Sequence, residues 1–193
     1  MKKAMSMVLS SLIILTMVGC GSENSNKDTT NKKSTETASI KENKTKILKE
    51  EEGTATYDDF LKVSLDDDYD TVVSKIGEPN SLLEQDKKKT YYWNLADGAS
   101  ISIILENEKV INKSQGLLKS QTANVSLEQY DKLEDNMTVD EVSEIMGEGI
   151  LTSEEIIDNY IRSFYSYINE DNSSVVITYK DGKLYSKSNN NLK

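Results

Sequence analysis

The sequence predicts an α+β fold made of two tandem repeats, each a helical hairpin packed on a three- to four-stranded antiparallel sheet. The first observation behind this prediction is an internal match. A shift of 70 residues superposes Gly77 on Gly147, and after a four-residue insertion a shift of 74 superposes Tyr91 on Tyr165. The second observation is that the spacing of apolar residues changes in each copy from helical to alternating. We therefore expect residues 56–120 to form the first repeat and residues 121–193 to form the second.

Two helices are expected at the start of each repeat. Apolar residues at helical spacing predict short helices at 57 to about 65 and at 127 to about 134. The second helix should begin at a capping residue, Asp68 in one copy and Thr138 in the other, where Glu141 completes a capping box. Gly77 and Gly147 stand where a C-cap needs a positive φ, so each should end its helix in the left-handed region.

The second part of each repeat has the pattern of antiparallel strands. Tyr91 and Trp93 alternate with polar neighbours, as do Tyr165 and Tyr167, and we expect these four side chains in the core. The other parity, with Tyr92 and with Phe164 or Ser166, should then point to the opposite face of the sheet. The dipeptides Asp97-Gly98 and Asp181-Gly182 separate alternating apolar runs, which predicts hairpin turns.

The first 55 residues carry signals of another kind. A basic start at Lys2 and Lys3, an apolar run to Val18 and the small residue Gly19 before Cys20 have the layout of a secretory signal. The alternative is a plain transmembrane anchor, but the run is short and contains serine and threonine. We expect residues 1–19 to be a signal peptide. Residues 20–55 are mostly polar and should form a disordered tether.

The segment Leu15-Thr16-Met17-Val18-Gly19-Cys20 resembles the lipobox of bacterial lipoproteins, although the family usually has leucine at the position of Met17. The resemblance implies that Cys20 is thioether-linked to diacylglycerol and becomes the first residue of the mature protein. More than one acyl chain is needed for stable anchoring. The expected location is the extracytoplasmic face of the bacterial cell membrane, where Cys20 holds the chain.

Composition excludes several classes of function. The chain has 33 Asp and Glu against 23 Lys and Arg, and a net charge of −10 repels nucleic acid. It has no histidine and one cysteine, so histidine triads, Cys-His dyads and the usual zinc sites are not available. We therefore predict no catalytic residue, no metal and no cofactor. A carboxylate-based hydrolase is the remaining enzymatic alternative, and it would need two acids about 5–10 Å apart.

One acidic run invites a calcium interpretation. Asp66, Asp67, Asp68 and Asp70 begin like a calcium-binding loop, but Thr71 stands where that loop needs glycine, and Gly77 where it needs glutamate. We favour a solvated loop in which Asp68 caps the following helix and Asp70 complements the helix dipole.

The region from Tyr57 to Leu192 resembles the tandem β-lactamase-inhibitor-protein-like fold. The features that carry this resemblance are the helix start in residues 136–142, the Ile-Met-Gly-Glu ending at Glu148, and the aromatic-then-hairpin segment that ends in Lys-Ser. Similar units occur in small outer-membrane assembly lipoproteins of the BamE type and in Gram-positive surface lipoproteins, and the latter look closest. The motifs concern capping and core packing, so the resemblance implies a fold rather than an activity. No cysteine remains here for the disulfides of the secreted inhibitor.

These observations lead to a functional hypothesis with two rivals. The first is a non-catalytic, membrane-anchored lipoprotein whose paired domains bind a protein or another envelope component. The second is an inhibitor of an envelope or secreted hydrolase that uses loop tips and one sheet surface, and the third is the carboxylate-based hydrolase. Aromatic side chains anchor interfaces and loop tips present contacts. The expected partner-binding residues are Tyr92, Asp97, Gly98, Phe164, Asp181 and Gly182.

Overall fold

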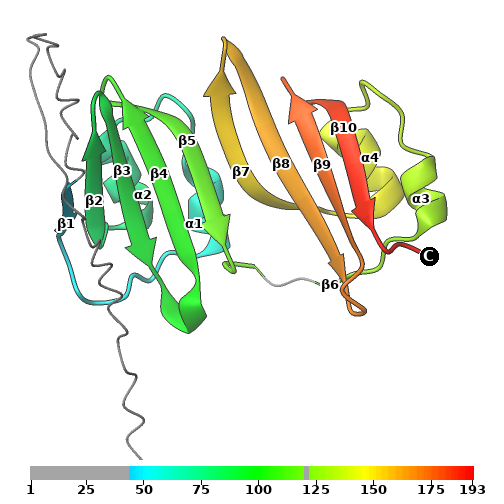
Figure 1. The fold of residues 1–193 in the computed structure, drawn as a ribbon, viewed down its shortest axis with the longest axis horizontal. Helices are drawn as coiled ribbons and strands as arrows, with labels where there is room; N and C mark the ends of the chain where they lie inside the picture. Colours follow the sequence, from blue (N-terminus) through cyan, green and yellow to red (C-terminus); the bar gives the residue numbers. More distant parts are fainter. Residues whose placement is uncertain (1–43, 120–121) are drawn as a thin grey trace, which may run out of the picture. The chain divides into compact units, whose positions relative to one another are not determined.

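A computed structural model describes residues 44–119 and 122–193, all within one structural unit (Figure 1). Cys20 and the predicted signal peptide lie outside the described residues. The helices are α1 (Tyr57–Lys62), α2 (Tyr69–Ile76), α3 (Leu127–Asp131) and α4 (Val139–Met146). The strands are β1 (Lys44–Ile47), β2 (Ser81–Gln85), β3 (Lys88–Asn94), β4 (Ser100–Glu106), β5 (Lys109–Gly116), β6 (Thr122–Ala123), β7 (Ile150–Ile157), β8 (Tyr160–Asn169), β9 (Ser174–Lys180) and β10 (Lys183–Asn190).

The strands form one continuous sheet, so the predicted fold class is wrong. The order is β1-β2-β3-β4-β5-β7-β8-β9-β10, every neighbouring pair in this order is antiparallel, and β6 pairs in parallel with the end of β8. The strand pair β5–β7 joins the two halves of the chain through Asn112–Glu155, Lys113–Glu154 and Ser114–Ser153. Two separate three- to four-stranded sheets, each under its own helical hairpin, are therefore not what the sequence encodes.

Strand β7 explains the difference, because its sequence does not alternate like a half-buried strand. Its middle carries Glu154 and Glu155, and two acidic residues in succession predict exposed positions. In the fold both carboxylates have partners on neighbouring strands. Glu154 lies 3.5 Å from Lys113 and accepts a hydrogen bond from the Ser163 hydroxyl, and Glu155 pairs with Arg162. Partners on neighbouring strands thus stabilise β7, although its own sequence lacks the alternation of a strand.

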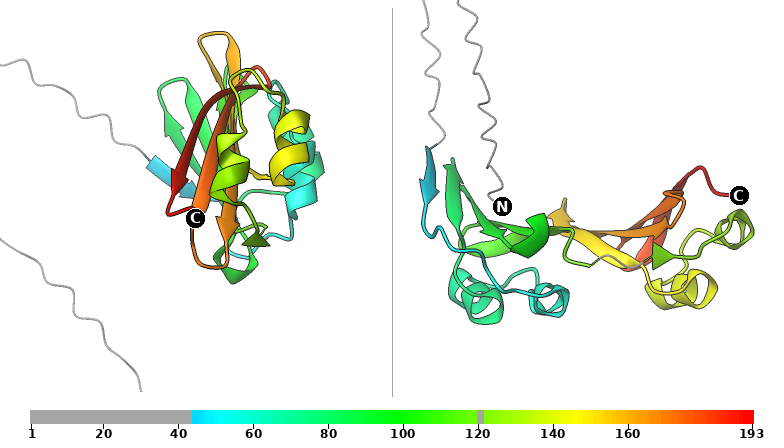
Figure 2. Two further views of the ribbon diagram at one scale, coloured as in Figure 1. Left: turned by 90° about the vertical axis from the view of Figure 1, so that its right-hand side faces the viewer. Right: turned by 90° about the horizontal axis from the view of Figure 1, so that it is seen from below.

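All four helices cover the same face of the sheet. One cross-strand row runs through Ile103, Lys113, Glu154, Ser163 and Tyr179, so these residues share a face. Ile103 belongs to the core packed under α1 and α2, and Tyr179 belongs to the core packed under α3 and α4. Figure 2 shows the helices on one side of the strands. The other side is called the open face below.

The two hydrophobic cores confirm the predicted alternation. Trp93 is fully buried, and Tyr91 and Tyr167 are also buried. Tyr165 is half-buried and packs against both cores. The Trp93 indole N–H donates to the carbonyl of Gly77, which ties the end of α2 to the sheet.

The predicted caps of the second helix in each half are confirmed. The Asp68 carboxylate accepts from the Thr71 N–H, and Thr138 forms a capping box with Glu141. Gly77 and Gly147 end α2 and α4 with φ of 79° and 80°. Their ψ values of −175° and −178° differ from the left-handed helical region that the sequence suggested.

Part of the predicted tether is structured. Strand β1 pairs with β2, and the segment after it is held by Asn80, whose side-chain amide donates to the carbonyls of Lys49 and Glu51. The Gly53 N–H then donates to the Asn94 carbonyl. Hydrogen bonds to its backbone attach much of this segment, so the polarity of its side chains did not reveal it. None of the helices in the described ranges has the length and hydropathy that crossing a membrane requires.

Candidate protein-binding face

One row of side chains on the open face crosses eight strands. The strand registers place these residues side by side, from β2 to β10, as Ser81, Tyr92, Ser102, Ser114, Ser153, Phe164, Thr178 and Ser186. The only large side chains in this row are Tyr92 and Phe164, and each is half-buried. Both aromatic residues that the sequence assigned to partner binding therefore lie on one surface.

Tyr92 and Phe164 stand on either side of a floor of small residues. Four strand-to-strand steps separate them, and at about 4.8 Å a step their backbones are about 19 Å apart. The three strands between them contribute Ser102, Ser114 and Ser153. A partner can approach the sheet backbone over these short side chains while its own apolar groups contact an aromatic ring on each side.

A neighbouring row of the open face, Glu155, Arg162 and Lys180, places charged side chains on β7, β8 and β9. Arg162 lies over the Phe164 ring, 5.2 Å from its centroid, and its Nε donates to Glu155 at 2.8 Å. The hydrogen bond that the guanidinium donates to Glu155 raises the pKa of Arg162. Lys180 lies 4.2 Å from the Tyr160 ring centroid. A cation over the face of an aromatic ring is attracted by the ring electrons, so both rings have a stabilising neighbour on the open face.

The predicted loop tips do not come together. Asp97 and Gly98 follow β3, whereas Asp181 and Gly182 follow β9, and the chain of antiparallel pairs makes β3 and β9 run in opposite directions (Figure 1). The two turns therefore lie at opposite ends of the strands. All four residues have positive φ, which confirms the predicted hairpin turns. The Asp181 carboxylate accepts from the Ile161 N–H, which explains its presence without a ligand.

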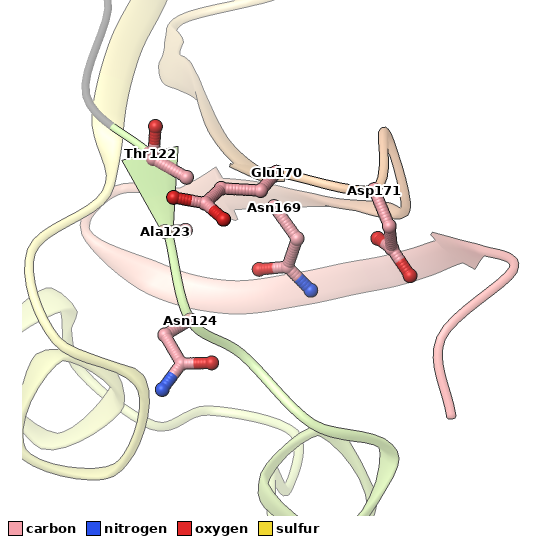
Figure 3. Close-up of a pocket in the computed structure, with 6 residues that line it drawn as sticks. All are labelled: Thr122, Ala123, Asn124, Asn169, Glu170 and Asp171. Atoms are coloured by element: carbon pink, nitrogen blue, oxygen red, sulfur yellow. The ribbon is translucent and has the colours of Figure 1, made fainter.

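A surface hollow near the end of β8 has a volume of about 470 Å³ and is shown in Figure 3. Its lining residues are Thr122, Ala123, Asn124, Asn169, Glu170 and Asp171. The Asn169 side chain binds the backbone of Val125 and the hydroxyl of Ser173. Hydrogen bonds from Ser173 lower the pKa of Asp171 to about 2. These groups stabilise the β8–β9 turn, so we assign the hollow a structural role.

The acidic run before α2 is also used internally. The Asp67 carboxylate accepts from the Ser64 N–H and from Lys75 at 2.6 Å, and Asp68 caps the helix. Within residues 44–119 and 122–193, no group of three or more histidine, cysteine, aspartate or glutamate residues could hold a metal ion.

Sequence reasoning missed the serines of the open-face row and Arg162. The alternation that placed Tyr92 on the open face also places Ser102 there, since Ser102 stands between the apolar residues Ile101 and Ile103. Ser153 could not be found in this way, because β7 itself was not predicted. Arg162 is identified only by the register that sets it beside Glu155.

Comparison with known proteins gives two positive findings. A sequence model of the family described as "Beta-lactamase inhibitor (BLIP)" matches residues 56–167. A crystal structure of a Streptococcus mutans protein, named "putative beta-lactamase inhibitor protein", superposes with a TM-score of 0.59 at 16% identity. That match covers 72% of this chain and 100% of the other, and at this identity it shows the fold alone. No curated protein matches the chain. Since the family match spans more than half of the sequence, this chain belongs to the beta-lactamase inhibitor (BLIP) family.

Proposed function

We propose that this chain is a non-catalytic binding module whose open face contacts a partner protein. The observation that carries the proposal is the row in which Tyr92 and Phe164 stand on either side of three serines. Tyrosine and other large aromatic residues are enriched at the energetically dominant positions of interfaces. Polar residues of small volume around them let a partner surface come close.

The size of the face fits this role. Eight strands about 4.8 Å apart, with about seven residues each at about 3.3 Å, cover on the order of 800 Å². One side of a standard protein interface buries a similar area. A small-molecule site would instead need a concave, mostly apolar pocket. Two hollows lined by described residues, including the one in Figure 3, are open, lie at turns and are lined almost entirely by polar residues.

Inhibition of a hydrolase is a second candidate function, and the family match favours it. In this function the partner is an enzyme, and binding across the open face blocks access to its active site. The hydrolase would be extracytoplasmic if the chain is exported, which is where β-lactamases and cell-wall enzymes meet their substrates.

Inhibition assays with purified β-lactamases test the inhibitor candidate, and variants of the open face show whether that face makes the contact. We expect the full chain to inhibit at least one enzyme of a panel, and Tyr92→Ser or Phe164→Ser to weaken inhibition by tenfold or more, about 1.4 kcal/mol. Leu61→Ser is the matched control, because Leu61 is exposed on α1, on the helix-covered side. Full inhibition by the double variant Tyr92→Ser/Phe164→Ser would exclude the open face as the contact surface. If no enzyme of the panel is inhibited, the inhibitor candidate loses its support, and the binding proposal then rests on cross-linking.

The location of the protein is also part of the proposal. The lipobox-like segment ending at Cys20 supports a lipid anchor on the extracytoplasmic side of the membrane. Labelling with a radioactive fatty acid tests this directly: the full chain should incorporate label, and Cys20→Ser should not. Equal labelling of the variant would contradict the anchor.

A further inference from the structure

Two lysines occupy corresponding positions in the two halves of the sheet. Lys113 on β5 donates to the carbonyl of Val63 after α1 at 2.6 Å, and Lys187 on β10 donates to the carbonyl of Leu133 after α3 at 2.8 Å. Each ammonium group also lies over an aromatic ring. The distance is 5.1 Å from Lys113 to the centroid of Phe60, and 4.4 Å from Lys187 to the centroid of Tyr130.

The two lysines differ in what lies on the next strand. β7 is paired beside Lys113 and places Glu154 opposite it, with 3.5 Å between the ammonium and the carboxylate. β10 is the last strand of the sheet, and in the part of the chain described here its outer edge has one isolated bridge, from Lys183 to Thr138. No carboxylate of the described residues forms an ion pair with Lys187. The lysine on β10 thus lacks the acid that its counterpart has.

The backbone of β10 is oriented to accept another strand at this point. The Asn169 N–H donates to the Ser173 carbonyl, and the Asp181 N–H donates to the Ile161 carbonyl. The odd-numbered residues of β8 therefore bond to β9, and Ile177, which lies opposite Tyr165, bonds back to β8. Lys187 lies opposite Ile177, so its N–H and C=O point away from β9. By the same alternation Asn189 also presents its backbone to the outer edge.

The hydroxyl of Tyr130 partly covers this edge. It donates to the Lys187 carbonyl at 3.2 Å, whereas the corresponding residue at the β5–β7 pair is Phe60, which has no hydroxyl. An added strand must compete with this hydrogen bond for the carbonyl. Tyr130 therefore protects an edge that the rest of the geometry leaves ready for pairing.

We propose that the outer edge of β10 is a second binding surface, which takes an extended segment of a partner protein carrying a glutamate or aspartate opposite Lys187. Strand β7 beside Lys113 is the internal template for this segment. Such an addition extends the sheet by one strand, with main-chain hydrogen bonds for affinity and the Lys187–carboxylate pair for specificity. This surface is separate from the open face, so either proposal can fail without the other.

A peptide with the sequence of residues 150–157, with solubilising ends, is the probe, and the same peptide with glutamine in place of Glu154 is its matched control. In amide exchange and NMR titration of the full chain, the first peptide should protect the N–H groups of Lys187 and Asn189. It should bind at least fivefold more tightly than the control, because a hydrogen bond to a charged group stabilises more than a neutral one. Equal binding of both peptides, or protection at β5 and β8 instead of β10, would overturn the proposal.

Three variants of the protein sharpen the test. Asn189→Pro removes an outward N–H and no bond to β9, so it should abolish peptide binding, whereas Asn189→Ala should not. Tyr130→Phe should raise the affinity about 2- to 10-fold, since the Lys187 carbonyl is then free. Lys187→Met should bind both peptides alike. An unchanged melting temperature shows that a variant is folded. A dimer in sedimentation that Asn189→Pro converts to a monomer would show that a second copy of the chain already occupies the β10 edge, and would also overturn the proposal.

Discussion

Gly77 and Gly147 show at the scale of single residues why glycine ends both eight-residue helices. Both combine a φ near +80° with an extended ψ, a region that residues with a Cβ atom essentially do not enter. Apart from the glycine and its neighbours along the chain, no heavy atom lies within 4 Å of the position that a Cβ would take at either glycine. The requirement for glycine is therefore conformational and does not come from crowding.

Alanine at these positions gives a prediction about stability. Gly77→Ala and Gly147→Ala should each lower the free energy of unfolding by about 1–3 kcal/mol, and by similar amounts, because the two backbones have the same angles. Urea unfolding of the two variants measures this. Gly116→Ala is the control, since Gly116 has no positive φ and a Cβ there meets only the Ser100 hydroxyl at 3.4 Å. The account is wrong if either cap variant is as stable as the control.

At the scale of the strands, the β5–β7 pair depends on the buried Lys113 side chain. Only 3% of this lysine is exposed, and burial lowers the pKa of its ammonium group below 10.5. Glu154 acts in the opposite direction and raises that pKa. The Glu154 carboxylate thus stabilises the charged form of the buried Lys113 side chain. Removal of one partner from such a pair leaves an uncompensated buried charge.

Glu154→Gln should therefore destabilise the protein by about 2–4 kcal/mol at pH 7. The folded variant then buries the charged Lys113 ammonium group without its carboxylate partner. Lys113 therefore loses its proton at a lower pH in the folded state than in the unfolded chain. The loss should consequently shrink as the pH rises through the lowered pKa of Lys113 toward 10.5. Urea unfolding at several pH values, always as a difference from the unchanged chain, measures the effect.

Glu155→Gln is the matched control for this prediction. Glu155 is the next residue and pairs with Arg162, which is about a third exposed. Glu155→Gln should lower the free energy of unfolding by about 1 kcal/mol or less, and this difference should not diminish over the same pH range. Equal losses for the two variants, or a Glu154→Gln loss that stays constant up to pH 10, would contradict the assigned role of Lys113.

The same strands mark the limit of what the sequence could predict. Caps, hairpin turns and buried aromatic residues were predictable, because each depends on neighbours within a few positions, as Thr138 depends on Glu141. Strand β7 was not, since its acidic centre is satisfied by Lys113 and Arg162 from other strands. Without β7 the two halves look like separate sheets. Of the candidate site, Tyr92 and Phe164 followed from alternation, but their common row depends on the β5–β7 register.

At the scale of the whole described fold, one sheet separates two kinds of surface. The helices and both cores occupy one face, and Tyr92, Phe164 and the serine row lie on the open face, outside both cores. The continuity of the sheet through β5 and β7 makes Tyr92 and Phe164 parts of one surface. The central claim is that this surface binds the partner, and that the helix-covered side does not.

Site-specific photo-cross-linking in cells that express the full chain tests this claim most directly. Val176 on the open face and Leu61 on α1 are a matched pair, because their exposed fractions are 41% and 43%. A photoreactive side chain at Val176 should give a discrete adduct, and Tyr92→Ser with Phe164→Ser should remove it. The same side chain at Leu61 should give none. An adduct that forms from Leu61, or one from Val176 that persists in the double variant, would contradict the assignment of the open face as the binding surface.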